Sequence, residues 1–186
     1  MLGEVEASGL RVPHHQALDF GCGVGRLTQA LAEHFERVVG VDIAPSMIAR
    51  ARQENRHGDR VRYVVNERSD LAGLGSERFD LILSLLVLQH MEPAYALGYV
   101  AEFLRLLTPG GAAVFNIPHT SWAQPSAWRR LWERWRGRPL MEMHGAGVDA
   151  VVNAVRAAGG AVATHCEVDW GAPGSLYVVT KTKKER

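Results

Sequence analysis

The sequence has little of several features that would point to particular classes of protein. It holds only two cysteines, Cys22 and Cys166, too few for a disulfide framework or a four-cysteine metal site. Its 21 Lys and Arg are balanced by 20 Asp and Glu, so it lacks the basic excess typical of proteins that bind bulk nucleic acid. We therefore expect neither a metal nor a nucleic-acid partner.

Long apolar runs and targeting signals are also missing. The longest uncharged stretch, residues 106–128, is interrupted by Pro109, Pro118 and Pro125, which a membrane-spanning helix does not tolerate in such density. The first ten residues carry two Glu and no basic residue, unlike a secretory signal. We expect no transmembrane segment and a cytoplasmic location.

The sequence alternates short runs rich in β-branched residues with segments of helical period, which predicts a parallel sheet flanked by helices. The expected strands are residues 17–20, 37–42, 61–65, 79–85, 112–117, 161–168 and 175–181. The expected helices begin near Leu27, Pro45 and Pro93, and a fourth spans residues 147–158. The segment 108–111, Thr-Pro-Gly-Gly, is expected to end the third helix before the next strand.

A glycine-rich loop, residues 21–25, follows the first expected strand and precedes a helix. Its spacing is GxGxG, whereas a dinucleotide-binding loop has GxGxxG. Asp42 ends the second strand, where a carboxylate can accept hydrogen bonds from both ribose hydroxyls. Taken singly, the glycines would suit any tight turn, and Asp42 would suit the start of a helix. Together they indicate an adenosyl ligand, and we expect Asp42→Ala to weaken its binding with little effect on the stability of the free protein.

Four segments of the chain carry a resemblance to a known family: LDFGCGVGRLTQALA, VVGVDIAPSMIARAR, FDLILSLLVLQHM and FLRLLTPGGAAVFNIP. They resemble the class I S-adenosylmethionine-dependent methyltransferases, and more closely their type-11 methyltransferase-domain group. The resemblance implies an α/β fold: a Rossmann-like, seven-stranded, mostly parallel sheet with helices on both faces and the last strand antiparallel. It is close over residues 17–117 and looser up to residue 181.

The same resemblance implies one methyltransferase domain over residues 1–186, divided into three parts. Residues 17–117 form the core, residues 118–146 are an insertion on the substrate side, and residues 147–181 supply the last helix and strands. Only 16 residues precede the first expected strand, where members of the group have one or two helices. We therefore expect an abbreviated N-terminal lid. The alternative explanations are a truncated gene, an excised domain, or a partner subunit, in a homodimer or another complex, that completes the lid.

The implied cofactor is S-adenosyl-L-methionine, which leaves as S-adenosyl-L-homocysteine. By the resemblance, Asp19 serves the methionine amino group, directly or through water. The backbone of Phe20, Gly21 and Gly23 lines the methionine moiety, and Asp42 binds the ribose.

The resemblance also implies which residues contact the adenine and the sulfonium. Ile43 and Met47 would lie against the adenine ring. A polar residue after the third strand would meet the adenine amino group; Glu67 aligns best, and Asn66 and Asp70 are the alternatives. Leu85, at the end of the fourth strand, would lie beside the sulfonium.

The absence of two motifs excludes some classes of methyl acceptor. No Asn/Asp-Pro-Pro-aromatic tetrad or Pro-Cys nucleophile follows the relevant strands, so the sequence predicts a small-molecule or saccharide acceptor, methylated at oxygen, nitrogen or carbon. His90 is the candidate catalytic base because its ordinary pKa suits proton removal near neutrality, although a lone histidine there equally suits a loop hydrogen bond or a helix cap. The alternative functions are an inactive cofactor-binding partner subunit and an RNA-modifying methyltransferase.

The segment 118–144 holds four of the five tryptophans. Trp128, Leu131, Trp132 and Trp135 fall on one face of a predicted helix, beside a cluster of arginines. We expect Trp128, Trp132 and His144 to contact the acceptor. The alternatives are that the tryptophans cover the edge of the sheet or that this helix lies on a membrane surface.

Overall fold

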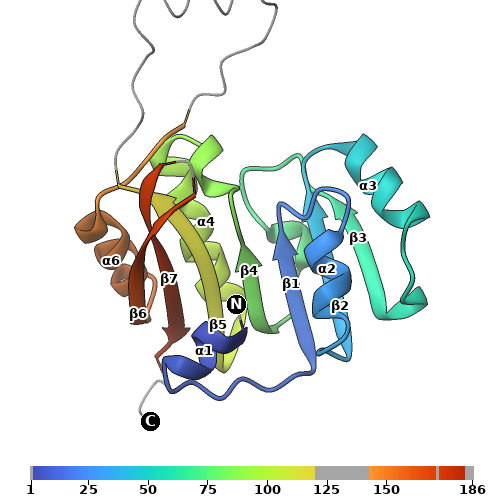
Figure 1. Cartoon of the computed structure of the whole chain (residues 1–186), viewed down its shortest axis with the longest axis horizontal. Helices are drawn as coiled ribbons and strands as arrows, with labels where there is room; N and C mark the ends of the chain where they lie inside the picture. Colours follow the sequence, from blue (N-terminus) through green and yellow to red (C-terminus); the bar gives the residue numbers. More distant parts are fainter. Residues whose placement is uncertain (1, 120–142, 171, 183–186) are drawn as a thin grey trace, which may run out of the picture.

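A computed structural model describes residues 2–119, 143–170 and 172–182 of the chain. Its centre is a seven-stranded sheet in the order β3-β2-β1-β4-β5-β7-β6 (Figure 1). All neighbouring strands among β1 to β5 pair in parallel, and β7 runs antiparallel to both β5 and β6. The strands are β1 Gln16–Phe20, β2 Arg37–Asp42, β3 Val61–Val65, β4 Phe79–Ser84, β5 Leu107–Pro118, β6 Gly160–Asp169 and β7 Pro173–Lys181. The fold class predicted from the sequence is confirmed.

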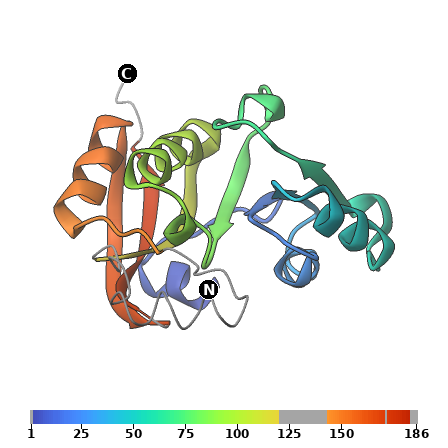
Figure 2. The same cartoon turned by 90° about the horizontal axis from the view of Figure 1, so that it is seen from above.

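Helices cover both faces of the sheet (Figure 2). The α-helices are α1 Leu2–Ala7, α2 Arg26–Leu31, α3 Pro45–Gln53, α4 Pro93–Leu106 and α6 Val148–Ala157, and the 3₁₀ turns are η1 Gly58–Arg60, η2 Ala72–Leu74 and η3 Leu88–His90. Side chains of α4 and α6 form one buried cluster with the sheet, and side chains of α1, α2 and α3 form the other. No helix of the described residues is long and apolar enough to cross a membrane.

The central strands and the longest helix follow directly from their residues. All six residues of β4 are buried, as expected for a parallel strand covered on both faces. Helix α4 begins at Pro93, a residue suited to the first turn, and buries its apolar side against the sheet. Phe103 of this helix lies with its ring 5.3 Å from that of Phe20 and 6.2 Å from that of Phe115, so β1 and β5 share one core.

Strand β5 is longer than the sequence predicted. It begins at Leu107, so the Thr-Pro-Gly-Gly segment belongs to the strand and does not separate it from α4. A register shift absorbs these residues, since Phe79 pairs with Leu107 while Leu81 pairs with Ala112. A Cβ at Gly111 would lie 2.9 Å from the carbonyl oxygen of Asp80, so the close approach of β4 and β5 requires glycine there.

Helix α1 is an element that the sequence analysis did not predict. It has only six residues, too few to show a clear helical period, and it is anchored by Val5, which is 2% exposed. It lies toward the amino-terminal ends of the parallel strands, at the bottom of Figure 1. It therefore does not cover the carboxyl ends of these strands, where the glycine-rich loop is located.

Candidate functional site

The crevice between β1 and β4 is where the order of the strands reverses. The chain proceeds from β1 to β2 and β3 on one side, and then returns to place β4 and β5 on the other. In sheets of this kind, ligands bind at the carboxyl ends of the strands beside such a switch point. The loops that follow β1, β2, β3 and β4 therefore form the candidate site.

The three glycines of the loop after β1 all have positive φ, but they meet different surroundings. A Cβ at Gly21 would lie 2.2 Å from Val87 Cγ2, and one at Gly25 would lie 2.2 Å from the Tyr63 hydroxyl. At Gly23, with φ +54°, a Cβ would meet no atom within 4 Å. Gly21 and Gly25 thus allow the loop to fit against the protein, while Gly23 leaves open space beside the backbone.

Asp42 connects the loops that follow β1 and β2. Its Oδ2 accepts a hydrogen bond from the Gly23 N–H at 2.8 Å, and its Oδ1 accepts one from the Ala44 N–H at 2.9 Å. These two hydrogen bonds argue against the expectation that Asp42 matters little to the free protein, because the carboxylate connects both loops in the absence of ligand. Each oxygen keeps a second lone pair, so the half-buried carboxylate can still accept hydroxyl groups.

Asp19 lies deeper than Asp42, at the end of β1. Its side chain is 2% exposed, and its Oδ2 accepts a hydrogen bond from Thr28 Oγ1 at 2.6 Å. Burial raises the pKa of this carboxyl group to about 6, although the Thr28 hydrogen bond acts in the opposite direction. The neighbouring Phe20 points into the core, where its ring lies 4.5 Å from that of Tyr99, so its side chain is not available to a ligand.

Cys22, within the glycine-rich loop, is not a nucleophile in this structure. Its side chain is 8% exposed, and burial raises the pKa of the thiol to about 12. The thiol therefore stays protonated near neutrality and contributes to packing beneath the loop.

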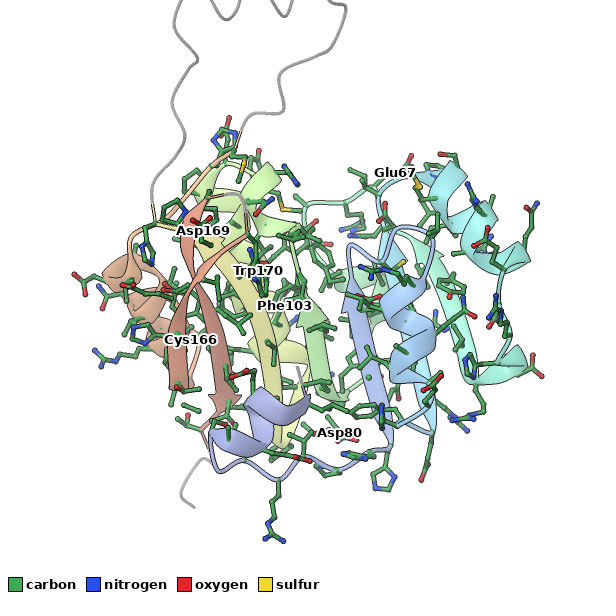
Figure 3. All side chains as sticks on the ribbon, in the orientation of Figure 1. Glu67, Asp80, Phe103, Cys166, Asp169 and Trp170 are labelled. Atoms are coloured by element: carbon green, nitrogen blue, oxygen red, sulfur yellow. The ribbon has the colours of Figure 1, made fainter. Side chains whose placement is uncertain are left out.

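The loops after β2 and β3 present two exposed apolar side chains and one unpaired carboxylate. Ile43 is 69% exposed and Met47 is 45% exposed, which is unusual for side chains of this size. Glu67 is exposed at the same edge, beside α3 in Figure 3, and within the described residues it forms no hydrogen bond or ion pair. In contrast, the Asn66 amide donates to the Asp70 carbonyl at 3.0 Å, and the Asp70 carboxylate pairs with Arg68 at 2.7 Å. Of the three candidates for the adenine amino group, Glu67 alone has a side chain without such partners.

The loop after β4 contains features that the sequence analysis missed. Leu86 has φ +61°, and its N–H donates to Asn116 Oδ1 at 2.7 Å. Leu85, expected beside the sulfonium, is half-buried and contacts the core cluster that includes Cys22. Leucine is not a residue that signals left-handed backbone, so no sequence pattern could have indicated the role of Asn116.

Two histidines that were expected on the acceptor side each contact Gln89 of η3. His90 is exposed, and its Nε2 lies 3.4 Å from Gln89 Nε2. The backbone N–H of His144 donates to the Gln89 carbonyl at 2.8 Å, so the chain after β5 returns to η3 at His144. A third histidine, His119, has its Nε2 2.8 Å from Ser175 Oγ. Trp128 and Trp132 lie outside the described residues.

Comparison with known proteins shows which family this fold and loop arrangement represent. A family model described as "Methyltransferase domain" matches residues 18–115, which include the glycine-rich loop, Asp42 and the loop after β4. The chain belongs to this family. The resemblance seen in the sequence is thereby confirmed.

This methyltransferase domain also matches curated proteins over about half of its length. It is 37% identical to nodulation protein S of Rhizobium tropici over 112 residues, which are 56% of this chain and 43% of that protein. It is 40% identical to ubiquinone biosynthesis O-methyltransferase of Cereibacter sphaeroides over 98 residues, 52% of this chain and 38% of that protein. The chain thus spans less than half the length of these two relatives.

Solved structures share the fold over nearly the whole chain. The N-methyltransferase NodS of Bradyrhizobium japonicum, in complex with S-adenosyl-L-homocysteine, has a TM-score of 0.69 at 21% identity, covering 98% of this chain and 84% of that one. Magnesium protoporphyrin IX methyltransferase of Synechocystis, also with S-adenosyl-L-homocysteine, has a TM-score of 0.70 at 19% identity, covering 97% and 80%. At these identities the likeness establishes the fold.

Proposed function

We propose that this domain binds S-adenosyl-L-methionine and transfers its methyl group to a small-molecule or saccharide acceptor, at oxygen, nitrogen or carbon. The observation that carries the proposal is the hydrogen bond from Gly23 to Asp42 at the switch point of the sheet. It joins an open glycine loop to a carboxylate at the end of the neighbouring strand, within a chain that belongs to the methyltransferase domain family.

The residues at this edge fit an adenosyl ligand. Gly23 leaves space for a ligand beside the loop backbone, and Asp42 has free lone pairs for two ribose hydroxyls. The exposed side chains of Ile43 and Met47 suit the two faces of a purine, and Glu67 can accept hydrogen bonds from its amino group. With a pKa of about 6, the Asp19 carboxyl group is mainly ionised at neutral pH, and the ionised form suits the ammonium group of the methionine moiety.

Methyl transfer mainly requires that the donor and the acceptor are held in the right orientation. The bound donor supplies a methyl group on a sulfonium that is already a good leaving group. The protein must therefore hold donor and acceptor in line, and this orientation can contribute several kcal/mol to catalysis. His90 would remove a proton where the acceptor is a hydroxyl or a protonated amine.

The apolar surface at this edge favours an acceptor with an apolar or aromatic part. The large apolar side chains that are exposed among the described residues lie in loops after β2, β4 and β6 or in the first turns of α3 and α4; they are Ile43, Met47, Leu86, Tyr95 and Trp170. The last three are on the side of β4 to β6, away from the proposed adenine contacts. We propose that the acceptor binds there, with His144, Trp128 and Trp132 as further contacts.

Titration calorimetry tests the proposed function. S-adenosyl-L-methionine and S-adenosyl-L-homocysteine should each bind with micromolar affinity, and NAD should not bind because the GxGxG loop lacks the spacing for a pyrophosphate. Binding of NAD, or of neither adenosyl ligand, would contradict the proposal. A screen of small hydroxyl and amine acceptors with labelled donor then separates an active enzyme from a cofactor-binding partner subunit.

A further inference from the structure

One residue after β4 has a backbone conformation that its own side chain disfavours. Leu86 has φ +61° and is the one non-glycine residue with positive φ among those that the structure describes. In this left-handed region the Cβ of an L-residue lies too close to the following carbonyl oxygen. The Leu86 side chain is 45% exposed, so its own burial does not account for the conformation.

The side chain of Asn116 supports this conformation from within the sheet. Its Oδ1 accepts the Leu86 N–H at 2.7 Å, and the residue is only 4% exposed. Asn116 lies in β5, which pairs with β4 on one side and β7 on the other, so its backbone is fixed by both neighbours. A short hydrogen bond from a rigid strand can offset the strain of one left-handed residue.

One neighbour of Leu86, Val87, contacts the glycine-rich loop. Val87 leaves no room for a Cβ at Gly21, which would lie 2.2 Å from its Cγ2. Leu85 contacts the core cluster that includes Cys22. The left-handed turn at Leu86 therefore helps to set how Val87 lies against Gly21 in the loop after β1.

We propose that Asn116 is a positioning residue of the methyl-transfer site. It holds Leu86 in the left-handed conformation and thereby sets the place of residues 85–87 beside the sulfonium. This inference rests on the proposed function and on the expectation that Leu85 lies beside the sulfonium. Asn116 acts through Leu86 and does not itself contact the donor.

The two adenosyl ligands distinguish this role from general stabilisation. S-adenosyl-L-methionine and S-adenosyl-L-homocysteine differ only in the methyl group and the positive charge at sulfur. A displaced 85–87 segment should change the ratio of their dissociation constants, whereas a general loss of stability should affect both ligands alike. This readout requires no knowledge of the acceptor.

The experiment measures both dissociation constants by calorimetry in the full chain and its variants. Asn116→Ala should change their ratio by about tenfold, corresponding to about 1.4 kcal/mol. Asn116→Asp keeps an oxygen that can accept the Leu86 N–H, but its added charge acts directly on the sulfonium, so this variant is compared by hydrogen exchange and not by the ratio. Leu86→Gly, added to Asn116→Ala, should restore the ratio because glycine adopts the left-handed conformation without support. Asn153→Ala, on the exposed side of α6, is the matched control.

Hydrogen exchange of the Leu86 amide in the free protein keeps the two proposals separable. The amide should be protected in the wild type and in Asn116→Asp, and should exchange fast in Asn116→Ala. An unchanged ratio of dissociation constants in Asn116→Ala, or unchanged exchange at Leu86, overturns the positioning role. If the wild type binds neither ligand while Leu86 remains protected, the failure lies in the proposed function and not in the hydrogen bond.

Discussion

Replacing Asp42 by Ala should destabilise the ligand-free protein as well as weaken donor binding. The carboxylate accepts the N–H groups of Gly23 at 2.8 Å and Ala44 at 2.9 Å, and both bonds are lost in the variant. A hydrogen bond to a charged group contributes about 1.5 kcal/mol at the lower end of its range, which suits this half-buried site, so the free energy of unfolding should fall by about 3 kcal/mol. For a chain of this size the melting temperature should fall by about 6–12 °C.

Urea and thermal unfolding of the ligand-free protein measure this effect. Asp42→Asn keeps one acceptor oxygen but directs an amide N–H at the other backbone donor, so it should lose less stability than Asp42→Ala and still clearly more than zero. Asp59→Ala is the control, because Asp59 is exposed in η1 and accepts no hydrogen bond within the described residues; it should stay within about 0.5 kcal/mol of the wild type. If Asp42→Ala behaves like this control, the carboxylate does not hold the two loops together, and the reasoning from the structure is refuted.

Two further predictions concern the residues beneath and within the glycine-rich loop. Because burial raises the pKa of Asp19 from 3.8 to about 6, its contribution to stability is present below the unfolded pKa and is lost as the pH rises through the folded pKa. In the wild type, this loss lowers the free energy of unfolding by about 3 kcal/mol between pH 3.5 and 7. Asp19→Asn should remove this pH dependence in urea unfolding, and an unchanged pH profile would contradict the raised pKa of Asp19. Gly25→Ala should cost more stability than Gly58→Ala, since both glycines have positive φ but only at Gly25 would the new Cβ overlap the Tyr63 hydroxyl. Equal losses in thermal unfolding would show that Tyr63 moves away without cost.

The elements of the sheet were accessible from the sequence where short apolar runs are bounded by turn residues. The expected strands 37–42 and 61–65 agree with β2 and β3 to the residue. The glycine-rich loop and Asp42 were also placed correctly, because the loop directly follows such a strand and Asp42 is the last residue of one. Local pattern and chain order are sufficient to bring them to the same edge of a parallel sheet.

Contacts between distant residues were not accessible in this way. The hydrogen bond between Leu86 and Asn116 joins residues 30 positions apart, and leucine carries no preference for left-handed backbone. The start of β5 was misplaced because its register shift depends on Asp80 and Gly111 lying close together, which the sequence does not encode locally. The double use of the Asp42 carboxylate likewise depends on how closely two loops approach.

Residues expected to contact the methyl donor were easier to place from the sequence than those expected to contact the acceptor. Residues of the donor side follow consecutive parallel strands, so their positions relative to one another are fixed by the fold. His90 and His144 come together at Gln89 only because the chain returns there after β5, and Trp128 and Trp132 lie outside the described residues.

Hydrogen–deuterium exchange with and without S-adenosyl-L-homocysteine tests most directly where the donor binds. We expect new protection in the loops after β1, β2, β3 and β4, centred on Gly23, Asp42, Glu67 and Leu86, with little change in α1 or β6. Protection at α1 or β6 without protection of these loops would contradict the assignment of the site to the carboxyl edge of the sheet.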